Sequence, residues 1–556
     1  MCGIHLAIWP ASSSPRPLDS VLRRRLCSRG PDHVGNVETR FADALLSFTS
    51  TVLSLRGNAV TIQPFEDPLS GSVLCWNGEA WKMDGRGVQG NDGAELFALL
   101  NRPDTDILDT IRSIEGPFAL VFFDKPSAKL FYARDRLGRR SLLARRDGDN
   151  DSLCLSSVAE RLDPNWVEVE ADGIYMLELS TLSPGSVPAP VRHPWVATPD
   201  LSQEMAGIGM FNTQILRPAS DSQPPAWPEA AAISALRDHL TESLRLRILG
   251  VPEPPSSGQD IDTRVAVLFS GGLDCTVLAR LCHDLLPATQ GIDLVNVAFE
   301  NPRIASQADK CHPQDDLYEA CPDRVTGRKS FAELLRVCPE RAWRFIAINV
   351  PFAETTAHRP EVVSLIYPHN TEMDLSIAYA LYFAARGKGK CYTAAEARLP
   401  NRDHYATPAR ILLSGLGADE LFGGYVRHAT AYSRRGYEGL VEELMLDVGR
   451  LGKRNLGRDD RIMSNWGREV RFPFLDERLV RWAVELPVWQ KCDFGTAENS
   501  SPGDGSDIEP AKRVLRLLAL TLGMPGVAGE KKRAIQFGSR TAKMESGKVK
   551  GTTLIS

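Results

Sequence analysis

The chain has 556 residues, of which 43% are hydrophobic and 24% charged, proportions typical of a folded globular protein of more than one domain. Sixty-five basic and seventy acidic residues leave a net charge of −5, which gives no electrostatic footprint for nucleic acid or an anionic membrane. No apolar stretch is long enough to cross a bilayer, and the N-terminus lacks the segments of a signal peptide.

The first half of the chain has short apolar runs separated by Gly, Asp and Asn turns. Runs at 73–76, 118–123, 130–133 and 153–156 predict strands, and residues 18–25 and 94–100 predict helices. A strand-rich segment with few helices predicts an α+β layered sandwich.

The second half alternates strands with helices. Proline-rich residues from about 184 to 228 predict a linker or crossover. After it we expect helices at 229–249, 275–286 and 373–386, and strands at 264–269, 294–299, 344–350 and 410–413. This order predicts βαβ units in a parallel sheet. Residues 301–329 and 495–508, rich in Asp, Gly, Ser and Pro, are predicted to be mobile surface insertions.

The eleven cysteines form no Cys-x-x-Cys pair, which predicts reduced thiols and a cytoplasmic protein. Cys2 follows the initiator methionine, whose removal would leave a thiol beside a free α-amine, a compact nucleophile–base pair. Position alone is weak evidence, because a cysteine at residue 2 is more often accidental.

Several motifs in order resemble the class II, N-terminal nucleophile glutamine amidotransferases. They are Met-Cys-Gly-Ile at the start, Arg29-Gly30-Pro31-Asp32, Asn77-Gly78-Glu79, Asp92 and the stretches 115–119 and 134–138. In isolation, Asn-Gly would be a hairpin turn and Asp92 a solvated surface residue.

The resemblance implies that Cys2 attacks the side-chain amide of glutamine and that Asn77 and the backbone N–H of Gly78 form the oxyanion hole. Glutamine-binding residues would be Arg56, Asn77, Glu79 and Asp92. The arginine that clamps the glutamine carboxylate in the family is replaced by Val52. Arg56, four residues further along an expected strand and about 13 Å away on the same face, is the candidate substitute.

Residues 268–275, Leu-Phe-Ser-Gly-Gly-Leu-Asp-Cys, follow a buried-type strand and open a helix. Two glycines and a helix N-terminus suit a phosphate, although an ordinary glycine turn is the alternative. The loop is not a Walker A motif. It resembles the Ser-Gly-Gly-x-Asp-Ser loop of ATP-pyrophosphatases, with Cys275, a weaker donor, in place of the last serine.

Two later blocks, 414–425 and 469–476, resemble the synthetase domain of glutamine-dependent asparagine synthetase. The resemblance implies an α/β parallel-sheet adenine-nucleotide-hydrolase-like domain that uses ATP and Mg²⁺. The ATP-binding residues it implies are Leu268, Ser270, Gly271, Gly272, Asp274, Cys275, Val297, Ser414, Gly415 and Tyr425. Asp274 and Asp419 would share the metal. Block 469–476 is expected to be structural, holding the sheet edge.

Two positions in this domain concern catalysis directly. A family lysine should lie among Lys531, Lys532 and Arg533, of which Lys532 is favoured, although a solvated basic turn is the alternative. Leu416 replaces the family glutamate that transfers a proton. Residues 139–143 and 536–540 resemble a diverged, asparagine synthetase domain-containing branch of the family.

The predicted organisation is an amidotransferase-like domain at 2–195, a linker at 196–228 and a synthetase-like domain at 229–556. The expected function is that of an asparagine synthase (glutamine-hydrolysing), a ligase that amidates an aspartate-type carboxylate through an acyl-adenylate and releases AMP and pyrophosphate. One alternative is a scaffold or regulatory pseudoenzyme that retains the fold, and another is adenylation with a changed acceptor. The expected partners are glutamine and aspartate-like small molecules, with no nucleic acid or membrane; a homodimer is compatible with the resemblance.

Overall fold

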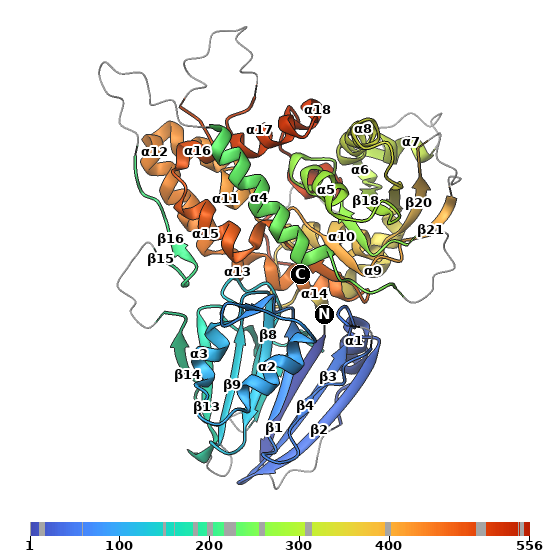
Figure 1. Ribbon diagram of the computed structural model, residues 1–556. Coiled ribbons are helices and arrows are strands. Elements are labelled where there is room, and N and C mark those ends of the chain that lie inside the picture. The colour runs from blue at the N-terminus through green and yellow to red at the C-terminus, as the bar shows by residue number, and fades with distance from the viewer. Residues whose placement is uncertain are drawn as a thin grey trace.

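The computed structural model describes most of the chain. The described residues are 2–10, 17–57, 59–147, 152–160, 162–181, 187–196, 204–215, 229–254, 262–305, 314–394, 402–495, 508–542, 544 and 550–555. They form two halves, one above the other in Figure 1. Within them no helix combines the length and apolar character needed to span a bilayer.

The first half contains two six-stranded antiparallel sheets, ordered β12-β10-β11-β1-β3-β2 and β14-β13-β9-β8-β5-β4. The strands are β1 (Gly3–Pro10), β2 (His33–Phe41), β3 (Ala44–Val52), β4 (Phe65–Glu66), β5 (Val73–Gly78), β8 (Phe118–Asp124), β9 (Lys129–Arg134), β10 (Leu143–Asp147), β11 (Ser152–Ser156), β12 (Trp166–Glu168), β13 (Gly173–Glu178) and β14 (Val191–Pro194).

Helices cover the outer faces of this sandwich. They are α1 (Ser20–Arg29), which packs on β1 and β3, and α2 (Asp92–Leu100) and α3 (Ile107–Arg112), which lie over the second sheet. Strand β8 explains the layering, because Val121 faces the core between the sheets while Leu120 faces the core under α2 and α3. The predicted α+β N-terminal nucleophile sandwich is confirmed.

The second half contains a seven-stranded sheet ordered β21-β20-β19-β18-β17-β22-β23. The strands are β17 (Val265–Leu268), β18 (Ile292–Phe299), β19 (Trp343–Val350), β20 (Lys388–Tyr392), β21 (Arg402–Ala406), β22 (Ile411–Leu413) and β23 (Glu469–Arg471). The five strands from β19 to β23 in this order are parallel, as predicted. The prediction omitted β20 and β21, which add an antiparallel edge.

Helices surround this sheet. They are α4 (Glu229–Ile248), α5 (Leu273–Leu285), α6 (Pro302–Ala305), α7 (Gln314–Glu319), α8 (Pro322–Val337), α9 (Phe352–Ile366), α10 (Glu372–Arg386), α11 (Ala418–Phe422), α12 (Val426–Gly449), α13 (Leu451–Arg454), α14 (Leu456–Ser464), α15 (Glu477–Glu485), α16 (Val488–Lys491), α17 (Arg513–Thr521), α18 (Pro525–Ala528) and α19 (Ile535–Gly538).

Strand order creates a crevice in this sheet. After β17 the chain adds β18 and β19 on one side and later returns to place β22 and β23 on the other. Ligands of open α/β sheets bind at such a switch point, beyond the carboxyl ends of the strands. The loops that follow β17 and β22 therefore meet where a ligand is expected.

One predicted insertion is wrong in part. The segment 301–329 includes the first half of α8, where Asp323, Arg324 and Thr326 are buried. Its composition suggested a surface loop, but burial of the helix against β18 and β19 overrides that preference. Residues 306–313, and 496–507 of the other insertion, lie outside the described residues. Of the predicted linker, residues 196 and 204–215 are described, and Met205, Ile208 and Phe211 join the core of the second half.

Candidate functional site

The predicted nucleophile and oxyanion donor lie together. Cys2 precedes β1 in the first sheet, and Asn77 is in β5 of the second. The Cys2 backbone nitrogen donates a hydrogen bond to Asn77 Oδ1 at 2.9 Å. The Nδ2 atom of Asn77 is buried and has no hydrogen-bond partner among the described residues. An unsatisfied buried donor is destabilising, so it is a group that an oxyanion beside Cys2 would satisfy.

Gly78 lets the chain pass close to its neighbours. A Cβ at this position would lie 2.7 Å from the Phe118 Cβ and 2.7 Å from the Trp76 ring. Only glycine therefore fits between Asn77 and Glu79 at this strand end.

The surroundings of the Cys2 thiol favour its neutral form. Burial raises its pKa, and Gln63 Nε2 donates a long hydrogen bond to its sulfur at 3.8 Å. An amide cannot accept the thiol proton. The predicted base, the α-amine of residue 2, would be the same nitrogen that bonds to Asn77.

The other residues predicted to bind glutamine lie in the same cavity as Cys2. Glu79 lies 3.1 Å from Nη2 of Arg471 and 3.5 Å from Nε of Arg56, and Asp92 Oδ2 accepts from Trp76 Nε1 at 3.0 Å. Burial raises the pKa of both carboxyl groups. With Cys2, they line a cavity of about 30 Å³, which has room for water but not for glutamine.

The route by which Arg56 reaches this cavity differs from the prediction. Strand β3 ends at Val52, so strand alternation does not carry Arg56 along the same face. Instead, the turn after the strand brings its guanidinium to the cavity wall, where Nη1 donates to the Ala80 carbonyl at 3.1 Å. The structure thus brings Arg56 to the site, and Val52 is also in its lining.

The Ser-Gly-Gly loop joins β17 to α5 at the switch point. Gly271 has a φ of +82°, and a Cβ there would lie 2.4 Å from the backbone nitrogen of Gly327 in α8. Ser330 Oγ holds the loop by donating to the Gly271 carbonyl at 2.6 Å. The loop is therefore clamped against α8. Cys275 is buried, its pKa is raised by burial, and its sulfur donates to the Gly272 carbonyl at 3.3 Å.

A cavity of about 490 Å³ lies over this loop, a volume typical of ligand sites. Its lining includes all the predicted ATP-binding residues except Gly271. Leu416, Lys531, Lys532 and Arg533 also line it.

The two predicted metal ligands converge. Lys512 Nζ lies 2.8 Å from each carboxylate oxygen of Asp274 and 2.9 Å from Oδ1 of Asp419. Lys532 also pairs with Asp419, through Oδ2. Burial alone would raise the pKa of Asp419, but the two ammonium groups outweigh it and hold the pKa well below its usual range.

These contacts test whether the carboxylates suit Mg²⁺. Two acids that share one ammonium are close enough to share one divalent cation, and carboxylate oxygens are ligands that Mg²⁺ prefers. Asp274 and Asp419 therefore fit the predicted role. Among the three basic candidates, Lys532 is the one whose ammonium reaches a predicted metal ligand; Arg533 instead donates to Thr326 Oγ1 at 3.0 Å.

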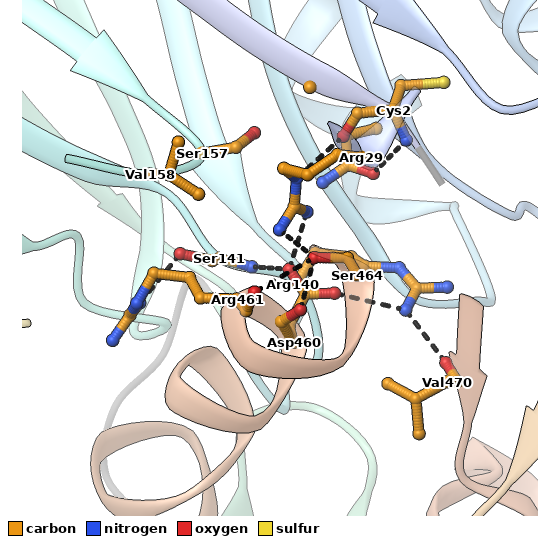
Figure 2. A network of polar contacts seen from close by, with 12 residues as sticks. Cys2, Arg29, Arg140, Ser141, Ser157, Val158, Asp460, Arg461, Ser464 and Val470 are labelled. Carbon is orange, nitrogen blue, oxygen red and sulfur yellow. Dashed lines mark hydrogen bonds and ion pairs between the residues drawn. The ribbon is translucent and has the colours of Figure 1, made fainter. Parts of the chain in front are cut away.

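A buried polar network joins the two halves next to Cys2 (Figure 2). Arg29 Nε donates to the Cys2 carbonyl at 3.4 Å, and its Nη2 lies 2.8 Å from Asp460. Arg140 donates to the Val470 carbonyl at 3.0 Å, and Asp460 also accepts from the Ser141 backbone. Cys2 is thus connected to α14 and β23 of the second half.

Comparison with known proteins identifies the family. A glutamine amidotransferase domain model matches residues 1–193, and an asparagine synthase model matches residues 433–519. Asparagine synthetase domain-containing protein 1 of Mus musculus is 32% identical over 99% of this chain and 98% of its own length. The chain belongs to the asparagine synthetase domain-containing family. The Homo sapiens family member is 32% identical over 98% of this chain and 96% of its own length. A Saccharomyces cerevisiae member is 31% identical over 92% and 86%, respectively.

Sequence reasoning about this family member missed three residues. Lys512 immediately precedes α17 as its N-cap and has a φ of +54°, a conformation that the sequence does not reveal. Asp323 was assigned to a surface insertion but lines the large cavity. Arg471 was assigned to the sheet edge, which β23 does form, but its side chain also reaches Glu79 in the other half. The one sequence signal for this contact is that Arg471 lies within a largely apolar strand segment, where a charged side chain needs a buried partner.

Proposed function

We propose that this protein is a two-site ligase. Cys2 releases ammonia from glutamine, and the second half adenylates a carboxylic acid with ATP. Ammonia then displaces AMP to form an amide. Aspartate is the acceptor that family membership suggests. The observation that carries the proposal is the convergence of Asp274 and Asp419 beside the clamped Ser-Gly-Gly loop, within one cavity.

Each residue has a chemical task in this scheme. Backbone N–H groups of the loop and the N-terminus of α5 bind phosphate oxygens. Asp274 and Asp419 would hold Mg²⁺, which offsets phosphate charge when it is bound. Lys512 and Lys532 supply positive charge to the pyrophosphate. In the first half, Asn77 stabilises the oxyanion formed when Cys2 attacks the amide.

The test follows products from both sites. Full-length protein is incubated with Mg·ATP, aspartate and either glutamine or ammonium chloride, and AMP, pyrophosphate and asparagine are measured. Cys2→Ala should abolish the glutamine-supported reaction and retain the ammonia-supported one. If no AMP or pyrophosphate forms with any carboxylic acid assayed, the ligase proposal is rejected.

A scaffold or regulatory role is the second candidate. It is favoured by the Cys2 cavity of about 30 Å³ and by Leu416, which cannot transfer a proton. Titration calorimetry with Mg·ATP separates the candidates, because binding without turnover supports a nucleotide-gated scaffold.

A further inference from the structure

The large cavity extends from the phosphate loop to the junction between the halves. Its far end is lined by the start of α10 and by residues near α13, including Met373, Ile377, Arg450 and Arg454. Helix α13 touches the first half, since Arg134 Nη1 donates to the Gly452 carbonyl at 3.4 Å. On the proposed function, ammonia arrives from this side, so this end would hold the acceptor.

One wall of this end is apolar. Met373, Ile377, Leu381 and Ala384 recur at helical spacing on the face of α10 that lines the cavity. The polar residues between Met373 and Ile377 in the sequence make hydrogen bonds within the protein. Asp374 accepts from Arg458 at 2.6 Å, and Ser376 Oγ donates to the Met373 carbonyl at 2.9 Å.

The acidic groups at this end are already paired. Asp447 accepts from Arg427 Nε at 2.8 Å and lies 2.9 Å from His428 Nε2. Asp459 accepts from Arg458 Nε at 2.9 Å. A ligand ammonium group would therefore find no unpaired carboxylate here among the described residues.

Two basic groups at the same end are unpaired. Arg450 and Arg454 line the cavity, and their guanidinium groups make no hydrogen bond or ion pair with any described residue. A guanidinium binds carboxylate or phosphate oxygens through paired N–H donors. The cavity thus offers both an apolar wall and two guanidinium groups without a protein partner among the described residues.

We infer that the acceptor is an organic acid that carries an apolar body and a second anionic group, and is not free aspartate. This inference rests on the proposed ligase function. Such an acid would pack its body on α10 and pair its second anion with Arg450 or Arg454. Aspartate would leave its α-ammonium beside guanidinium groups without a counter-charge and would not cover the apolar wall.

Four acids test the inference by titration calorimetry of the full-length protein. Benzylsuccinate has both features, succinate lacks the body, 3-phenylpropionate lacks the second anion, and aspartate is the alternative. We expect benzylsuccinate to bind at least about tenfold tighter than the other three. Aspartate binding as tightly as benzylsuccinate overturns the inference, as does failure of every acid to bind.

Variants separate the two features. Arg450→Gln with Arg454→Gln should weaken benzylsuccinate about tenfold or more and leave 3-phenylpropionate unchanged. Ile377→Asn should weaken both phenyl acids and spare succinate. Arg434→Gln, which changes an exposed arginine of α12 outside the cavity, is the matched control. Unaltered benzylsuccinate binding in the double variant overturns the inference.

A parallel assay keeps the two proposals distinct. Acid-dependent exchange of pyrophosphate into ATP is measured with the same four acids. If benzylsuccinate binds in the expected order but no acid supports exchange, adenylation is rejected and the preference of this end of the cavity still stands.

Discussion

The oxygen and the nitrogen of the Asn77 side-chain amide have different environments. Its oxygen fixes the backbone of Cys2, and its buried nitrogen has no partner among the described residues. Asn77→Ala should lower kcat for glutamine hydrolysis about 10²–10³-fold with little change in KM, because the lost donor acts on the transition state. Released glutamate is the measurement, and exposed Asn165→Ala is the control. An unchanged kcat would contradict the predicted role of Asn77 as an oxyanion donor.

Asp323 links pH to stability. Burial, the largest influence, raises its pKa to about 7 from an ordinary 3.8, against the opposing charges of Arg533 and Lys532. Between these two pH values the folded protein holds a proton that the unfolded chain has lost. Its contribution to stability is therefore greatest below the ordinary pKa and decreases as pH rises toward 7.

Removing this titration should be visible in denaturation. The stability of Asp323→Asn minus that of the parent protein should be more favourable at pH 8 than at pH 5. The expected change in this difference is on the order of 2 kcal/mol, since one pKa unit corresponds to about 1.4 kcal/mol. Urea midpoints at both pH values give the measurement. Exposed Asp43→Asn should show no such difference, and parallel profiles for Asp323→Asn would contradict the prediction.

Among the structural elements, the clamp between the Ser-Gly-Gly loop and α8 depends on the absence of a side chain at Gly271. Gly271 has a φ of +82° and faces α8, whereas Gly250 has a φ of +71° with open space around it. Gly250→Ala thus measures left-handed strain alone, roughly 1 kcal/mol. Gly271→Ala should cost more and abolish Mg·ATP binding, because the loop must shift. Thermal unfolding and calorimetry check both, and equal losses of stability would exclude the clamp.

Local sequence patterns predicted secondary structure well where a single apolar face or a single motif determines the element. The apolar run in β8 and the strand–glycine–helix order at 268–275 required no distant information. The sequence pattern failed where composition and burial disagree. The first turn of α8 contains Pro322, Asp323 and Arg324, a composition typical of a surface loop, but this turn is a helix with buried side chains. The pattern also could not place Lys512, since its role depends on carboxylates that only the folded sheet brings near.

At the scale of the whole molecule, buried ion pairs cross the junction between the two halves. Arg471 lies 2.6 Å from Glu469 and 3.1 Å from Glu79 across the junction, and all three are buried. Arg471→Gln would leave two buried carboxylates without their shared cation, which typically costs about 3–5 kcal/mol. Chemical denaturation should show this loss.

A second pair across the junction provides the control. Arg478 lies 3.7 Å from Glu115, but both side chains are partly exposed to solvent. Solvent screens such a pair, so Arg478→Gln should change stability by about 1 kcal/mol or less. Equal losses of stability in the two variants would contradict the prediction that burial makes the Arg471 ion pairs more stabilising than the exposed pair. The order of the motifs predicted both halves. The ion pair between Glu79 and Arg471 could not be predicted, because it depends on how the two halves pack against each other.

Lys512 has one more consequence. Two adjacent, partly buried acids would normally repel each other until a cation joined them, and many metalloproteins unfold when a chelator removes that cation. Here an internal ammonium already balances Asp274 and Asp419. Treatment with EDTA should therefore leave the melting temperature unchanged, whereas Lys512→Met should make it depend on added divalent salt. The protein has, in effect, its own permanent counter-ion.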